Sequence, residues 1–131
     1  MELERQSKAH LGMRSADKLM RDYFKDKINL VNYWGPVQMC VFYLEYVFLP
    51  LNYRIVIECE RGFITICIKN QENKRFSPWM IYPDANYYHY EDRINDIEQL
   101  VKLTHQAIVK QEISFFDDKE IVELGIEFFD K

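Results

Sequence analysis

The stretch YRIVIECERGFITICIKN, residues 53–70, reads as two β-strands joined by a tight turn at Arg61-Gly62. A two-residue turn fixes the pairing register, because a shift by one residue would send every inward side chain to the opposite face. With Glu60 set opposite Phe63, one face carries the pairs Cys59/Ile64, Ile57/Ile66 and Ile55/Ile68. The other face carries Glu58/Thr65 and Arg54/Lys69, with Val56/Cys67 between them. One apolar and one mostly polar face is typical of an antiparallel sheet that is covered on one side.

A helix and a further strand are predicted before this hairpin. Ser15 can cap a helix that runs to about Asn29, with residues 1–14 either frayed or extending it. Gly-Pro at 35–36 then ends helical structure, because proline cannot continue a helix. Residues 37–48 are dense in Val, Phe and Tyr, which favours a largely buried strand. The alternative is a helix with four inward residues: Phe42, Tyr43, Tyr46 and Val47.

Two helices are predicted after the hairpin. Residues 71–75 form a polar loop, and residues 79–82, flanked by two prolines, form a short edge strand. Apolar residues recur at helical spacing from about Arg93 to Gln111. A second helix starts at Asp117, which can cap it, with Glu120 three residues later. We therefore expect an α+β fold: an antiparallel sheet of three to four strands with an N-terminal helix and two C-terminal helices packed on it. The 131 residues form a single domain.

The composition is that of a folded domain. Apolar residues make up 48% of the chain and aromatic residues 15%, too many for a disordered protein. The longest apolar run, residues 37–51, is shorter than the roughly 20 residues that span a bilayer, and it contains Glu45. The N-terminus MELERQSK has neither the basic nor the apolar region of a signal peptide. We expect a cytoplasmic protein without membrane contact. The cysteines (Cys40, Cys59 and Cys67) lack CxxC spacing and are expected to be free thiols.

No catalytic residue, metal site or cofactor is predicted. His89 stands beside Glu91 and Asp92, but no second histidine lies at metal-ligand spacing. The glycines form no phosphate-binding motif. The only basic helix face, Arg14, Lys18, Arg21 and Lys25, is interleaved with aspartates at ion-pairing distance. A self-paired, solvated face is the preferred interpretation, and we expect no nucleic-acid partner.

The most unusual segment is YPDANYYHYED, residues 82–92. Tyrosine combines a large contact area with a hydrogen-bonding tip, which suits protein interfaces. Residues 91–131 carry 5 Lys/Arg and 11 Asp/Glu, a net charge of −6 that favours a basic protein partner. The predicted partner-binding residues are Tyr87, Tyr88, Tyr90, Glu91, Asp92 and Asp96. In the competing interpretation these tyrosines pack back onto the sheet and the acids stabilise a helix N-terminus.

In layout and composition the chain resembles an immunity protein of a bacterial toxin–immunity pair, such as those of contact-dependent growth inhibition. The likeness lies in the hairpin 53–70, the segment SPWMIYP at 77–83, the tyrosine-rich loop and the ISFF ending at 113–116. The resemblance implies a small binding protein that neutralises a toxin by occluding its active site. One alternative is a small enzyme or ligand-binding domain, with a pocket between sheet and helices and Trp34, Trp79 or His89 at its mouth. Another is an oligomerisation module that pairs through an edge strand near residues 79–82.

Overall fold

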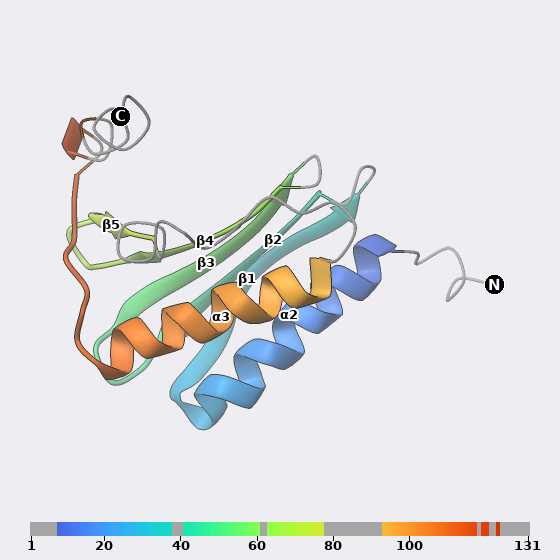
Figure 1. Cartoon of the computed structure of the whole chain (residues 1–131), viewed down its shortest axis with the longest axis horizontal. Coiled ribbons are helices and arrows are strands. Elements are labelled where there is room, and N and C mark those ends of the chain that lie inside the picture. Colours follow the sequence, from blue (N-terminus) through green and yellow to red (C-terminus); the bar gives the residue numbers. More distant parts are fainter. Residues whose placement is uncertain are drawn as a thin grey trace.

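The computed structural model describes residues 8–37, 41–60, 63–77 and 93–117, together with residues 119, 120 and 123. In this part of the chain, two α-helices pack on one face of a five-stranded antiparallel sheet (Figure 1). The elements in chain order are α2 (Lys8–Phe24), the 3-10 turn η1 (Lys25–Lys27), β1 (Ile28–Val37), β2 (Val41–Phe48), β3 (Tyr53–Glu60), β4 (Phe63–Lys69), β5 (Arg75–Phe76) and α3 (Arg93–Val109). The strands lie in the order β1-β2-β3-β4-β5. The predicted α+β class is confirmed, but the sheet has five strands instead of three to four.

The hairpin of β3 and β4 has the register predicted from the sequence. Glu60 pairs with Phe63, and every pair back to Arg54 and Lys69 is the expected one. The inward face is fully buried at Ile55, Ile57, Cys59, Ile64, Ile66 and Ile68. The helices α2 and α3 lie side by side on this face (Figure 1). The isoleucines of the hairpin therefore belong to the same buried core as the inward residues of the two helices.

The strand predicted over residues 37–48 is confirmed for Val41–Phe48, which form β2, whereas Val37 belongs to β1. Burial along β2 alternates instead of being continuous. Its inward residues are Phe42, Leu44, Tyr46 and Phe48. This period of two excludes the helical alternative for residues 41–48, because a helix would bury positions three and four residues apart. Tyr43 and Val47, inward in that alternative, are only half-buried.

The helix α2 begins before Ser15, so the predicted cap at that residue is wrong. Residues 8–14 are helical and extend the helix. The reason is a buried stripe at a spacing of four residues: Gly12, Ala16, Met20 and Phe24. Gly12 is part of this stripe, and an added Cβ there would lie 3.7 Å from the Phe42 ring, an ordinary contact distance. Packing on the sheet thus holds the first turns in place without the predicted cap.

The predicted end of this helix is also wrong, and a strand follows where a turn was expected. Lys25 adopts a φ of 55°, which ends α2 and turns the chain into β1. Gly35 has a φ of 83° and lies within a register shift between Trp34 and Val37. Gly-Pro therefore makes a bulge inside β1, and an edge strand tolerates Pro36 because one side of it needs no N–H donor.

The strand β5 is the second strand that the sequence did not predict; residues 71–75 were expected to be a loop. Arg75 pairs with Lys69 of β4 on one side and with Phe116 on the other. The Arg75 N–H donates to the Phe116 carbonyl at 2.8 Å, and the Phe116 N–H donates to the Arg75 carbonyl at 2.9 Å. Phe116, 41 positions further along the chain, thus pairs with the outer side of β5. No local sequence pattern could indicate this contact.

The helix α3 confirms the predicted span from Arg93 almost to Gln111, with Ile97, Leu100, Val101, Thr104 and Ile108 buried. The capping contacts predicted at Asp117 are also present. The Glu120 N–H donates to Asp117 Oδ1 at 2.8 Å, and the Asp117 N–H donates to Glu120 Oε1 at 3.3 Å. However, the elements of the described residues include only two α-helices, α2 and α3. Of the second predicted C-terminal helix, residues 119, 120 and 123 are described and are helical, and its other residues after Asp117 lie outside the described part. The predicted strand 79–82 lies outside it entirely.

Candidate functional site

The partner-binding residues predicted from the sequence fall almost entirely outside the described residues. Tyr87, Tyr88, Tyr90, Glu91 and Asp92 belong to the segment 78–92, which the structure does not describe. Asp96 belongs to α3, within the turn whose side chains are not described. The candidate site that the structure does show lies along β1.

The two edges of the sheet differ. At one edge, β5 is only two residues long and is paired with Phe116 on its outer side. At the other edge, β1 is ten residues long and pairs with β2 alone among the described residues. We refer to the side of β1 that faces away from β2 as the β1 edge. It presents backbone donors and acceptors that another strand can bind.

The β1 edge also exposes large apolar side chains. Val31, Tyr33 and Trp34 have 47%, 64% and 54% of their surface exposed. None of the ten residues, INLVNYWGPV, is charged. Proteins usually protect an edge strand with charged side chains, prolines or bulges. Here two register shifts and Pro36 are the only such protection in β1.

The two aromatic residues lie on opposite faces of the sheet. Tyr33 pairs with Leu44, an inward residue, and so faces α2. Trp34 pairs with Tyr43, on the outer face. The β1 edge therefore carries an aromatic ring on each face of the sheet. A partner strand that pairs with β1 would contact one of these rings on each of its own faces.

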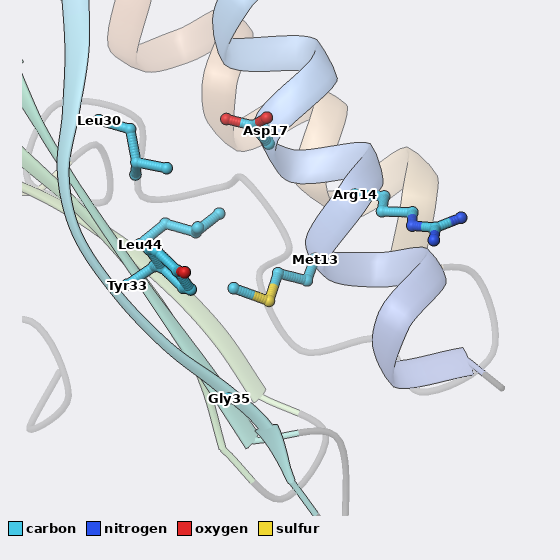
Figure 2. A pocket seen from close by; sticks show the side chains of 7 residues that line it. All are labelled: Met13, Arg14, Asp17, Leu30, Tyr33, Gly35 and Leu44. Carbon is cyan, nitrogen blue, oxygen red and sulfur yellow. The ribbon is translucent and has the colours of Figure 1, made fainter. Parts of the chain in front are cut away.

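A pocket of about 350 Å³ lies beside the β1 edge, between α2 and the strands (Figure 2). It is lined by Met13, Arg14 and Asp17 of α2, by Leu30, Tyr33 and Gly35 of β1, and by Leu44 of β2. Figure 2 shows Met13 pointing from α2 toward the strands, whereas the Arg14 guanidinium points away from them. The volume is at the lower end of the range for small-molecule sites, about 300–1,000 Å³.

One polar group of the pocket is held by the protein itself. Tyr46 Oη donates to Asp17 Oδ1 at 2.6 Å, and Arg21 Nε donates to Asp17 Oδ2 at 3.0 Å. Burial, together with the hydrogen bond to Asp17, raises the pKa of Tyr46 far above its ordinary value. The same carboxylate raises the pKa of Arg21. Asp17 therefore joins α2 to β2 through a neutral tyrosine, and both of its oxygens are engaged.

A second polar cluster supports the outer face next to Trp34. Tyr43 Oη donates to Glu45 Oε1 at 2.7 Å, and Arg54 Nη1 donates to Glu45 Oε2. Burial disfavours the charged form of Glu45, but the hydrogen bonds from Tyr43 and Arg54 outweigh it and lower its pKa. Burial and the bond to Glu45 raise the pKa of Tyr43 to about 12. Trp34 thus lies beside a fixed, fully paired polar cluster.

The remaining sequence predictions have mixed outcomes. The basic face of α2 is self-paired as expected, through Lys18–Asp22 at 2.7 Å and Arg21–Asp17. Cys59 and Cys67 are free thiols. Tyr33 lines the pocket beside α2, whereas Trp34 is not among its lining residues. Trp79 and His89 lie outside the described residues.

The described part of the chain contains no group of three His, Cys, Asp or Glu side chains arranged to hold a metal ion. Neither of its helices combines the length and apolar character that crossing a bilayer requires.

Sequence reasoning missed the β1 edge, although residues 28–37 carried a signal. This segment is uncharged and rich in β-branched and aromatic residues between the charged run 25–27 and the hairpin.

Comparison with known proteins does not identify a family for this chain. No family model, no curated protein and no solved structure matches it.

Proposed function

We propose that this chain is a small binding protein that neutralises a partner by occluding its active site. In this proposal the protein is cytoplasmic and the partner is a bacterial toxin domain, as the resemblance to immunity proteins implies. The acidic residues 91–131 favour a partner of basic character. The observation that carries the proposal is the β1 edge: a ten-residue uncharged edge strand with Val31, Tyr33 and Trp34 exposed.

Exposed aromatic side chains on both faces of an edge strand support binding to a protein. Tryptophan and tyrosine are the side chains that most often dominate interface energies. An edge strand adds main-chain hydrogen bonds to an extended segment of a partner, while side chains on either face select it. The β1 edge offers both, with Tyr33 on the helix side and Trp34 on the outer side.

Charge would guide the partner without taking part in the strand contact. Residues 91–131 carry a net charge of −6, which attracts a basic domain from a distance. The tyrosines and acids at 87, 88, 90–92 and 96 stay in the proposal as a second contact. Exchanging Glu91 and Asp92 for Lys should slow association and flatten its salt dependence if they steer the partner.

The direct test uses the purified protein and, as the candidate toxin, the purified product of the neighbouring gene. Isothermal titration calorimetry should give a defined complex. Trp34→Ala should weaken it at least tenfold, since an anchor contributes more than about 1.4 kcal/mol. Leu51→Ala is the matched control, because Leu51 is 51% exposed but lies in the turn between β2 and β3. The proposal fails if the toxin does not bind, or if both variants bind as tightly as the native protein.

The pocket beside α2 favours a second candidate function, the binding of a small apolar ligand. Its lining of Met13, Leu30 and Leu44 suits an apolar group, and Asp17 lies at its polar side. NMR screening with a library of apolar fragments tests this idea. Shifts confined to these residues would support it, and no shifts at millimolar fragment concentrations would refute it.

A further inference from the structure

We infer that, in the absence of its partner, a second copy of this chain covers the β1 edge. The two β1 strands run antiparallel about a twofold axis near Asn32, and the two five-stranded sheets become one. This inference rests on the proposed function in one respect, because the second copy occupies the edge proposed for the partner. Self-pairing would then regulate that site by competition.

The absence of charge in β1 favours its own copy as the occupant. In a twofold antiparallel pair the residue on the axis faces its own copy, and a residue next to the axis lies diagonally close to its copy. A charged residue at these positions would therefore approach a like charge, which destabilises a strand pair. Because residues 28–37 include no charged side chain, β1 can pair with itself without this penalty.

The side chains near the axis complement one another in this arrangement. With the axis at Asn32, the two Asn32 amides face each other and can exchange hydrogen bonds. In a regular pairing Val31 of each copy lies opposite Tyr33 of the other, and Val31 is also the residue at the register shift between Leu30 and Asn32. A β-branched residue opposite an aromatic one is a favourable cross-strand pair. All three are exposed in the single chain and available for the contact.

The neighbouring helix does not oppose the approach of a second copy. On α2, the helix beside β1, Lys18 is paired with Asp22 and Arg21 with Asp17. With Arg14 included, residues 14–22 of the helix carry a net charge of +1. Two α2 helices that flank the junction on the same side of the joined sheet therefore repel each other only weakly.

The available area fits a weak dimer. Ten residues of strand extend about 33 Å, and a band about 15 Å high along them covers roughly 500 Å² per copy, or about 1,000 Å² in total. That total lies at the lower limit for a specific interface. A shorter segment would bury less, so a strand of equal length is needed to reach the limit. The two register shifts in β1 and the missing N–H of Pro36 weaken the pairing further. We therefore expect a dissociation constant in the micromolar range.

Sedimentation velocity of the purified protein from about 1 to 300 µM tests the inference. The native protein should shift from monomer to dimer across this range. Asn32→Lys should raise the dissociation constant at least tenfold, because two lysines would meet at the axis. Leu51→Lys, a charge added at an exposed apolar residue away from β1, should leave it unchanged. Circular dichroism and thermal melts of both variants check that they fold.

A cross-link locates the axis independently of stability. Asn32→Cys should form a disulfide-linked dimer under mild oxidation, because directly opposed strand residues lie about 4.5–5.5 Å apart, within disulfide range. The native protein and Leu51→Cys serve as controls for the native thiols and should not cross-link. A native protein that stays monomeric at 300 µM overturns the inference. So does a dimer that Asn32→Lys leaves intact.

The two proposals can fail separately. A monomeric protein that still binds the toxin through Trp34 would refute self-pairing alone. A dimer paired at Asn32 that binds no toxin would refute the proposed function alone. If both hold, excess toxin should convert the dimer into a complex with one copy of each chain.

Discussion

The contact between Tyr46 and Asp17 gives a quantitative test of how α2 is attached to the sheet. Tyr46 is 1% exposed, and its hydroxyl donates to Asp17 Oδ1 at 2.6 Å. A hydrogen bond to a charged group contributes about 1.5–3 kcal/mol to stability. Water can replace the lost donor at Asp17, whose side chain is 32% exposed. We therefore expect Tyr46→Phe to lower the free energy of unfolding by a value near the bottom of that range, about 1.5 kcal/mol.

The assay is urea unfolding monitored by circular dichroism, supported by thermal melts. A loss of about 1.5 kcal/mol corresponds to a fall in Tm of roughly 4–8 °C for a domain of this size. Tyr33→Phe is the control, because Tyr33 also lines the pocket but is largely exposed; it should change stability by less than about 0.5 kcal/mol. A double-mutant cycle with Asp17→Ala isolates the pairwise energy. A coupling energy near zero, or an unchanged Tyr46→Phe variant, would refute the assigned role of this bond.

Three further predictions follow from the fold. Gly12→Ala should raise the free energy of unfolding by about 0.5–1 kcal/mol, because the added Cβ meets Phe42 at an ordinary distance; destabilisation in urea titrations would show that α2 packs more closely than the structure has it. Ile66→Ala should cost about 2–5 kcal/mol, whereas the outward Thr65→Ala should stay within about 0.5 kcal/mol; equal losses would contradict the hairpin register. Burial, and the nearby Lys27 cation, lower the pKa of His105, so stability should fall as the pH drops from about 6.5 through this lower pKa, because the unfolded chain then binds more protons. His105→Gln should remove this part of the pH dependence in melts between pH 7 and 5, and an unchanged slope would exclude His105 as its source.

The hairpin and α3 were predictable because their determinants are local. A two-residue turn with isoleucine at alternate positions admits one register, and helical spacing from Ile97 to Ile108 admits one face. The cap and the end of α2 were mispredicted for the opposite reason. Ser15 lies inside a helix whose first turns are held by Gly12 and Ala16 against the sheet, a tertiary effect that overrides the capping preference.

The formation of β1 depends on local composition, but its position at the edge depends on tertiary structure. Its composition favours a strand, but Gly-Pro at 35–36 is a turn signal unless the segment lies at a sheet edge, and edge position depends on the whole topology. The Arg75–Phe116 pairing likewise joins residues that share no sequence pattern. Consequently the sequence predicted the core but not which strands form the edges of the described sheet. The predicted partner site at 87–92 falls outside the described residues, so it stays a prediction.

Amide hydrogen exchange measured by mass spectrometry tests the central claim, that β1 is the binding edge, most directly. At about 1 µM protein, peptides covering residues 28–37 should exchange faster than those covering β3, because within the described part of the chain β1 pairs on one side only. Addition of the toxin should slow exchange in 28–37 and leave the already paired peptide around Arg75 unchanged. Slowing confined to other segments, with 28–37 unaffected by the bound toxin, would contradict the account.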